Sequence, residues 1–181
     1  MYQEIQKYVD SGYLSVADGT YSELPDFEQS LAKLGSFQWS SFDDLTLSTF
    51  VLSAHFKWSS AKENTLLAGC GFVFADATKA VFLDDKTVTL LTFLVTSAEV
   101  PKSDGSGRVN FKNSDEADFT LIMNNEQKKV FVLVNNEFNV EYDLSGYDPI
   151  SGSIGYAMIS GTNTDYGTKC EITNARLWEI E

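Results

Sequence analysis

The sequence LAGCGFVF (residues 67–74) decides the fold, together with the two apolar runs that follow it, VFLDD (81–85) and VTLLTF (88–93). All three runs are short, rich in β-branched and aromatic residues, and separated by Asp, Lys and Thr. Such runs, joined by connections of a few residues, are typical of antiparallel strands that follow one another in a sheet. The sequence therefore predicts a β-meander over residues 66–94.

A second pattern indicates that one face of a strand is buried. In FVLSAHFKW (50–58) the even-numbered positions are all apolar, while the odd-numbered positions are mostly polar. Side chains alternate between the two faces of a strand, so this pattern predicts one face in the core and one in solvent. His55, the only histidine, belongs to the polar set beside Lys57, and we expect it at the surface.

The rest of the chain continues the same pattern. A turn cluster is followed by a short strand, three strands joined by Asn-rich turns come next, and two strands close the chain. Because no long helical pattern separates the strands, the sequence favours two packed antiparallel sheets over βαβ crossovers. In the order given, these segments are 103–107 (turn), 108–112, 118–123, 129–134, 138–142, 151–159 and 170–178.

The N-terminal part is the least sheet-like. Ile5, Tyr8 and Val9 give one weak amphipathic turn, and residues 26–35 combine a capping-box pattern, helical spacing and a final glycine, which predicts one short helix. We therefore divide the chain into an N-terminal extension, residues 1–45, that packs on or leads into the sandwich, and a sandwich domain, residues 46–181. Three aromatic residues at the end of the extension act either as a lid or as a docking strip: Phe37, Trp39 and Phe42.

Charge excludes some classes of partner. The chain has 13 Lys and Arg against 26 Asp and Glu, a net charge of −13. Such a surface repels phosphate backbones and anionic lipid heads, so we expect no nucleic-acid partner. No apolar run is long enough for a transmembrane segment, and no signal peptide is expected within this chain.

The two cysteines, Cys70 and Cys170, are far apart and form no CxxC motif, which argues against a zinc or thioredoxin-like site. Two readings remain open on spacing alone. The cysteines are either two buried free thiols or one disulfide that closes a loop of about 100 residues.

Five segments follow one another in a recognisable order: FVLSAHFKW, GCGFVFAD, AVFLDDKTVTLL, ADFTLIMNNEQKKVFVLVNNE and CEITNARLWEI. Their order resembles the concanavalin A-like lectin/glucanase jelly roll, with a closer likeness to laminin-G-like and 3-keto-disaccharide hydrolase-like domains of secreted bacterial proteins. The resemblance covers about residues 38–181 and implies a jelly-roll β-sandwich.

On the closing strand of this pattern, the apolar spacing predicts a β-bulge near Asn174. Alternation then turns Cys170 inward with Ile172, and Cys70 inward with Phe72 and Phe74. We therefore expect a Cys70–Cys170 disulfide, formed where the two sheets converge, and with it an oxidising compartment.

The resemblance also shows what this chain lacks. Glucanases of the fold carry an E-x-D-x-x-E strand, and here Glu116 and Asp118 fill the first two places but Leu121 the third. The hydrolase-like domains carry Arg, Glu and Gln where this chain has Ala75 and the apolar run 81–83. We therefore expect no catalytic residues. The alternative is a glycoside-cleaving domain that uses Asp84, Glu116 or His55 in an unfamiliar arrangement.

Ligand contacts are expected from two sources. Outer-face positions of the meander, Val73, Phe82 and Asp84, could stack on sugar rings or bury a partner, unless the N-terminal segment covers them. Aromatic residues near loops, among them Trp39, Tyr156 and Tyr166, could present rings to a sugar, or else pack over the sandwich edges.

No cofactor is expected. The oxygen-rich segments at 84–85, 113–118 and 163–165 could hold a structural calcium ion, with ordinary solvated turns as the alternative. The function that these observations favour is a non-catalytic, lectin-like carbohydrate-recognition module, extracellular or at the cell surface, within a larger surface protein. The alternatives are a glycoside hydrolase-type enzyme and a structural or adhesive protein-interaction domain.

Overall fold

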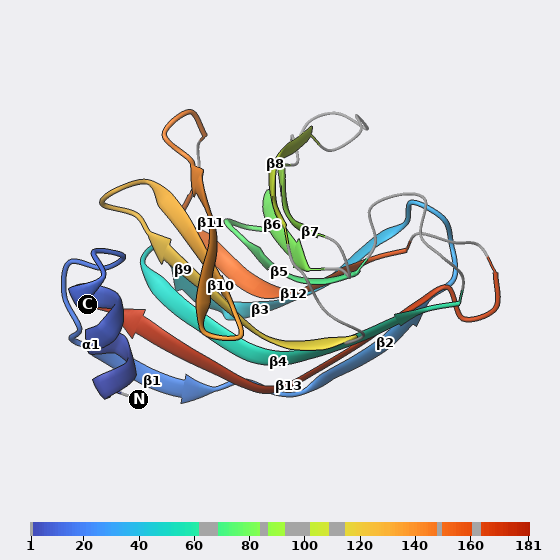
Figure 1. The fold of residues 1–181 in the computed structure, drawn as a ribbon, viewed down its shortest axis with the longest axis horizontal. Helices are drawn as coiled ribbons and strands as arrows, with labels where there is room; N and C mark the ends of the chain where they lie inside the picture. The colour runs from blue at the N-terminus through green and yellow to red at the C-terminus, as the bar shows by residue number, and fades with distance from the viewer. Residues whose placement is uncertain are drawn as a thin grey trace.

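Figure 1 shows a computed structural model of the chain, which describes residues 2–61, 69–83, 87–92, 102–108, 115–147, 150–160 and 164–181. One helix is followed by a long series of strands. In chain order the elements are α1 (Tyr2–Asp10), β1 (Gly19–Glu23), β2 (Phe27–Leu31), β3 (Phe37–Leu47), β4 (Phe50–Ser60), β5 (Gly69–Phe74), β6 (Lys79–Leu83), β7 (Thr87–Thr92), β8 (Lys102–Arg108), β9 (Glu116–Asn124), β10 (Lys129–Val134), β11 (Glu137–Asp143), β12 (Gly152–Ile159) and β13 (Thr168–Ile180).

The strands form two antiparallel sheets that pack face to face, which confirms the predicted sandwich. The seven-stranded sheet has the order β1-β13-β4-β9-β10-β11, with β2 also paired to β13. The six-stranded sheet has the order β3-β12-β5-β6-β7-β8. The first 47 residues thus supply strands to both sheets, and β3 runs across the expected boundary between residues 45 and 46.

A cluster of phenylalanines joins the two sheets in the interior. Phe72 of β5 lies 4.9 Å from Phe56 of β4 and 5.5 Å from Phe119 of β9, measured between ring centroids. Phe56 and Phe119 are themselves 5.0 Å apart. All three side chains are fully buried. Phe56 belongs to the even-numbered positions of β4, Phe72 lies on the same face of β5 as Cys70, and Phe119 belongs to the odd-numbered positions of β9. Alternation along each strand thus turns these positions into one shared core.

The meander β5–β6–β7 and the three strands β9–β10–β11 pair in sequence, as predicted. The turn predicted at 103–107 is wrong, because these residues belong to β8, which pairs with β7 from Lys102 to Arg108. The free edge of β7 offers backbone partners to this Gly- and Ser-rich segment, and a register irregularity between Thr89 and Leu90 accommodates it. Of the strand expected at 108–112, Arg108 is the last residue of β8, and the rest lies outside the described residues.

The helix predicted within 26–35 is also wrong. Phe27–Leu31 forms β2, antiparallel to Thr168–Ile172 of β13. Phe27 and Leu31 are four residues apart, a spacing that places them on one face of a helix and equally on one face of a strand. The open edge of β13 decides between the two, because it supplies the backbone hydrogen-bond partners that a strand requires.

Helix α1 covers the outer face of the seven-stranded sheet. Its buried residues Ile5 and Tyr8 pack in a cluster with Val51, Ile122 and Phe131. Val51 is the apolar exception in the polar set of β4, and its position beneath the helix explains that exception. The expectation that the N-terminal segment covers the meander therefore fails for α1, which lies on the opposite sheet (Figure 1).

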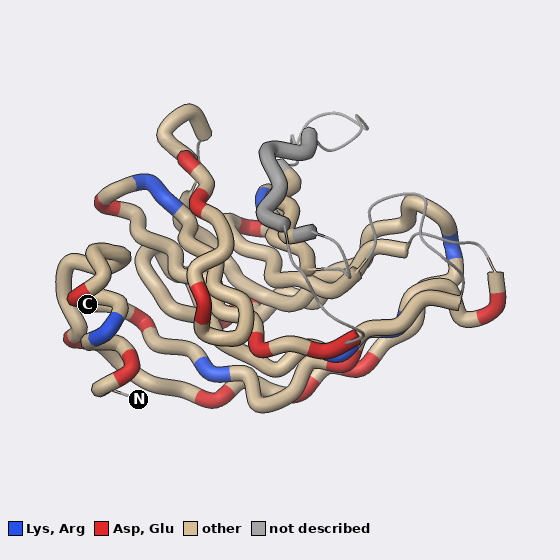
Figure 2. Tube along the Cα trace, viewed as in Figure 1, with Lys and Arg blue, Asp and Glu red and all other residues tan. Residues whose placement is uncertain are grey.

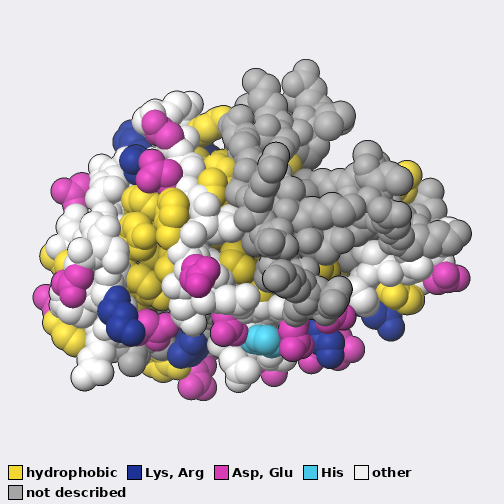
Figure 3. Space-filling view, viewed as in Figure 1, with side chains coloured by type: hydrophobic (Ala, Val, Ile, Leu, Met, Phe, Trp, Pro, Cys, Tyr) yellow, Lys and Arg dark blue, Asp and Glu magenta, His cyan; other side chains and the backbone are white. Residues whose placement is uncertain are grey.

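Beyond α1, the outer face of the seven-stranded sheet carries the polar positions of β4 and β9, and an exposed ring, Phe138, on β11. Acidic positions are spread along the chain in Figure 2 and outnumber basic ones. His55 is visible in Figure 3 (cyan) with acidic side chains nearby, and its Nδ1 lies 3.0 Å from Oδ1 of Asp118.

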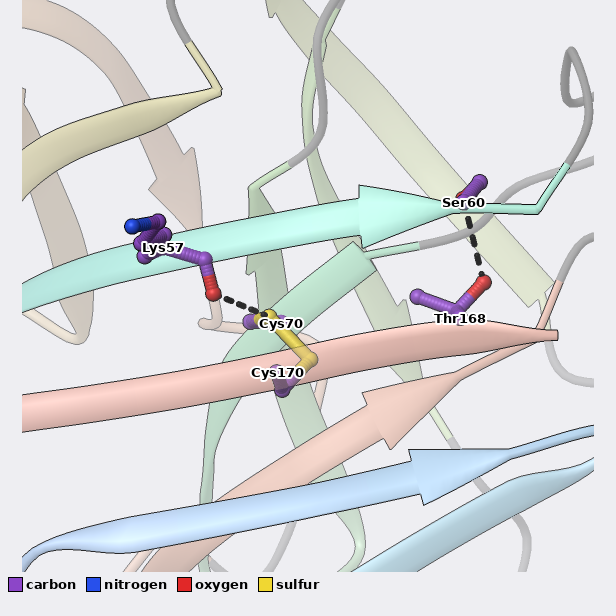
Figure 4. Close-up of a disulfide and its surroundings, with 5 residues drawn as sticks. All are labelled: Lys57, Ser60, Cys70, Thr168 and Cys170. Carbon is purple, nitrogen blue, oxygen red and sulfur yellow. Dashed lines mark hydrogen bonds between the residues drawn. A yellow bond between two sulfur atoms is a disulfide. The ribbon is translucent and has the colours of Figure 1, made fainter. Parts of the chain in front are cut away.

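A disulfide links β5 to β13 and thereby the two sheets (Figure 4). Cys70 and Cys170 are both buried, with their Cα atoms 5.7 Å apart. The spacing of the cysteines was compatible with free thiols or with a disulfide, and the structure has the disulfide. The Lys57 carbonyl oxygen lies 3.8 Å from Cys70 Sγ, which has no proton to donate in a disulfide. Close by, the hydroxyls of Ser60 and Thr168 hydrogen-bond at 3.2 Å.

The predicted bulge is present on β13. The register of β13 on β4 shifts between Thr173 and Arg176, and Asn174 has a φ of 55°. Asn tolerates this left-handed conformation better than most residues. The extra residue reverses the phase of the strand, so that Ala175 and Leu177 continue the buried face begun by Ile172.

We predict that replacing both cysteines, Cys70→Ala with Cys170→Ala, lowers the free energy of unfolding by about 2–4 kcal/mol, because the cross-link restricts a long loop of the unfolded chain. Urea denaturation followed by tryptophan fluorescence measures the change. Alkylation of the unfolded chain with and without reductant provides the control for the bond itself. Equal urea midpoints for the oxidised and reduced wild-type chain would contradict the prediction.

Candidate functional site

The outer face of the six-stranded sheet carries a second apolar cluster, separate from the core. Its members come from β5, β6, β7 and β12 and are buried. They point away from the sandwich interior because they alternate with core residues along each strand. We call them the outer-face cluster: Val73, Ala80, Phe82, Leu91, Ala157 and Ile159.

Strand β3, at the edge of this sheet, extends the cluster with an aromatic pair. Phe37 packs edge-on against Phe82, with ring centroids 5.8 Å apart and an interplanar angle of 78°. Trp39, two residues further along the same face, stacks on Phe37 at 5.1 Å and 25°. Phe37 is half-buried, whereas Trp39 is 49% exposed. The pair therefore rests on a packed base and presents an indole ring to solvent.

The predicted lid or docking strip is divided by the alternation of β3. Phe37 and Trp39 lie on the outer face, while Phe42 points inward and meets Tyr156 edge-on at 5.2 Å. A register irregularity where β3 pairs with Ser153 and Ile154 follows Phe42 along the edge. Only the first two residues of the strip are therefore placed to contact a ligand.

Two predicted ligand residues, Val73 and Phe82, are fully buried in the outer-face cluster. Their side chains do face outward, as expected, but they do not reach the surface, and their expected contact with a ligand stays a prediction. They support the aromatic pair instead, through the contact of Phe82 with Phe37. Asp84, the third predicted outer-face residue, lies outside the described residues.

Tyr156 is a core residue and not a loop residue. It lies within β12, is 2% exposed, and packs against Phe27 and Phe42. Its hydroxyl donates a hydrogen bond to the Pro25 carbonyl oxygen at 2.7 Å. Burial, together with the charge of Asp26, raises the pKa of this hydroxyl. Tyr156 therefore packs as a core residue whose hydroxyl is bound to the backbone, and its expected contact with a ligand stays a prediction.

Tyr166 is half-buried just before β13. Lys169 Nζ lies 4.6 Å from the centre of its ring, within the range of a cation–π contact. No described interaction joins Tyr166 to the Trp39 pair, so its expected role in ligand binding remains a prediction.

The acidic residues considered for catalysis lie on the other sheet. Glu116 and Asp118 of β9 flank His55, with Glu116 Oε2 3.8 Å from Nε2 and Asp118 Oδ1 3.0 Å from Nδ1. Leu121, at the third place of the glucanase motif, is buried in the core. Strand β9 pairs with β4 and β10 without a register shift, so position 121 faces the interior while 116 and 118 face out.

Metal binding finds no support in the described ranges, where no three His, Cys, Asp or Glu side chains are grouped to hold an ion. Of the oxygen-rich segments expected to offer calcium ligands, 84–85 lies outside those ranges, as do parts of 113–118 and 163–165. No helix among the described residues has the length and apolar character needed to cross a bilayer.

Solved structures with the same fold are found at low sequence identity. A carbohydrate-binding module, CBM66 from Bacillus subtilis, is 10% identical over 88% of this chain and 96% of its own, with a TM-score of 0.54. The carbohydrate recognition domain of Emp47p is 14% identical over 88% and 91%, with a TM-score of 0.55. A fructosyltransferase from A. japonicus is 15% identical over 90% of this chain but 26% of its own, with a TM-score of 0.54.

No protein-family model and no curated protein matches the sequence. The structural likenesses establish that the chain has the concanavalin A-like lectin/glucanase fold, a class that includes carbohydrate-binding modules and carbohydrate-active enzymes. This confirms the fold that the sequence motifs indicated. Because the identities are low, the likenesses concern the fold alone.

We predict that Tyr156→Phe lowers the free energy of unfolding by about 1 kcal/mol, because it removes a hydrogen bond that the buried Tyr156 side chain donates to the Pro25 carbonyl oxygen. Chemical denaturation measures the loss. Tyr21→Phe is the matched control, since the Tyr21 hydroxyl contacts an exposed Glu23 at 3.2 Å, and we expect no measurable change there. A stable Tyr156→Phe variant with impaired ligand binding would instead assign Tyr156 to a binding site.

Proposed function

We propose that this chain is a carbohydrate-recognition module that binds a glycan on the outer face of its six-stranded sheet. The observation that carries the proposal is the stacked pair of Trp39 and Phe37, supported from below by Phe82. An exposed indole held flat by a second ring offers the kind of apolar surface on which the CH face of a sugar ring stacks. Similarity in fold to carbohydrate-binding modules and lectin domains supports the same ligand class.

The charge of the chain narrows the class of glycan. With a net charge of −13, the protein repels polyanionic chains at long range. Neutral glycans carry no such penalty, and their hydroxyls can be bound by carboxylates as well as by amides. The proposed ligand is therefore a neutral oligosaccharide or polysaccharide.

The proposed setting is extracellular or at a cell surface, as one domain of a larger surface protein. The buried Cys70–Cys170 disulfide supports this setting, because such bonds form and persist in oxidising compartments. The acidic surface is consistent with a domain that stays soluble beside a polysaccharide.

We predict that Trp39→Ala weakens glycan binding about tenfold or more, because removal of a central aromatic contact costs on the order of 1–2 kcal/mol. A glycan array identifies the ligand and isothermal titration calorimetry measures its affinity. Tyr21→Ala is the control, since Tyr21 is another exposed aromatic, 39% exposed, on an edge strand of the other sheet. Absence of binding to every neutral glycan tested would refute the proposal and favour an adhesive, protein-binding domain.

An enzymatic function is the second candidate, favoured by the position of His55 between two carboxylates. Under the recognition proposal we expect the wild-type chain to release no reducing sugar from the glycans it binds. Release of reducing ends that is lost in Glu116→Gln, and kept in the outward-facing control Glu171→Gln, would replace recognition by glycoside hydrolysis.

A further inference from the structure

A groove crosses the outer face of the seven-stranded sheet, on the side of the molecule opposite the outer-face cluster. Its first section lies between α1 and the β10–β11 hairpin and encloses about 680 Å³, with walls that include Lys7, Tyr13 and Phe138. Its second section encloses about 520 Å³ and reaches His55 and Asp118. Glu4 and Asn136 line both sections, so the two hollows adjoin.

The first section has an aromatic floor. Phe138 is 50% exposed and stacks on Tyr13, with ring centroids 6.0 Å apart and an interplanar angle of 21°. Tyr13 in turn contacts the buried Phe131 at 4.8 Å. Phe138 lies opposite Leu133, which belongs to the apolar cluster beneath α1, so the ring faces the groove side of the sheet. Figure 3 shows hydrophobic side chains gathered between α1 and the β10–β11 hairpin.

The second section is polar, and its ionisable side chains contact one another. Arg176 lies 3.9 Å from Glu4, and His55 lies 3.0 Å from Asp118. In the first section, burial raises the pKa of the Tyr8 hydroxyl to about 12, with Glu4 adding to the effect. Tyr8 is therefore a neutral hydroxyl at neutral pH, and the groove offers donors and acceptors without an excess of positive charge.

The length of the groove follows from the strand order. Phe138 lies on β11 and His55 on β4, and the order β4-β9-β10-β11 places three strand spacings between them. At about 4.8 Å per spacing, the groove extends about 14 Å across the sheet. An elongated ligand that crosses the strands fits this shape better than a single small molecule.

We propose that this groove is a second binding site, which takes a neutral oligosaccharide. The stacked rings of Phe138 and Tyr13 bind the apolar face of one sugar, and the carboxylates and amides toward His55 bind hydroxyls of the sugars that follow. An anionic ligand is disfavoured because the cations that line the groove, Lys7 and Arg176, are balanced by the carboxylates of Glu4 and Asp118. With the Trp39 surface on the other sheet, the chain would contact glycans on two opposite sides, which increases avidity for a polymer.

The test is a titration of the full, ¹⁵N-labelled chain with cellohexaose, xylohexaose, mannohexaose and maltohexaose, followed by amide chemical shifts. We predict shifts at residues that line the groove, and a binding constant about tenfold weaker in Phe138→Ala. Tyr2→Ala is the matched control, because Tyr2 is a 55% exposed aromatic on α1 that does not line the groove. Asp118→Asn tests the polar section separately, and we expect weaker binding there too.

Three results would overturn the proposal. One is the absence of groove shifts with all four sugars. Another is a groove that responds to a hexauronate but to no neutral sugar. The third is a concentration-dependent dimer that produces the same shifts without sugar and is lost in Phe138→Ala, which would assign the groove to a second copy of the chain. Loss of binding in Trp39→Ala with intact groove shifts separates this site from the one on the six-stranded sheet.

Discussion

The packing of Phe72 against Phe56 and Phe119 is the interaction on which the rest of the structure depends. It brings β5 of one sheet against β4 and β9 of the other, in a region where all three side chains are fully buried. The Cys70–Cys170 bond lies two residues from Phe72 on the same face and fixes the same approach of the sheets covalently. Once this face of each strand is committed to the core, the opposite face must be covered or exposed.

The outer faces of the two sheets are covered by different elements. On the seven-stranded sheet, α1 covers the apolar positions and leaves a polar groove beside it, with Phe138 at one end. On the six-stranded sheet, the outer-face cluster is capped at its edge by Phe37 and Trp39. Both surfaces combine an exposed ring with a supporting ring beneath it: Trp39 on Phe37, and Phe138 on Tyr13.

Prediction from the sequence was best where apolar and polar residues alternated along a single strand. The alternation in 50–58, the consecutive strands of 118–142 and the phase change near Asn174 were all read correctly, because each depends on the local geometry of one strand. Prediction failed at Phe27–Leu31 and at 103–107, where the local signal fitted a helix or a turn. In both, an open strand edge elsewhere in the chain supplied the partner that decided the conformation.

The sequence by itself determined the class of fold and, for the strands it predicted from alternation, which face points into the core, because alternation of side chains is a property of the strand alone. Only the tertiary structure decided which residues reach the surface. Val73 and Phe82 face outward yet are buried, Tyr156 is held in the core by Pro25, and Tyr13 meets Phe138 across a long stretch of sequence. Exposure depends on what packs above a side chain, and residues distant in sequence provide that covering.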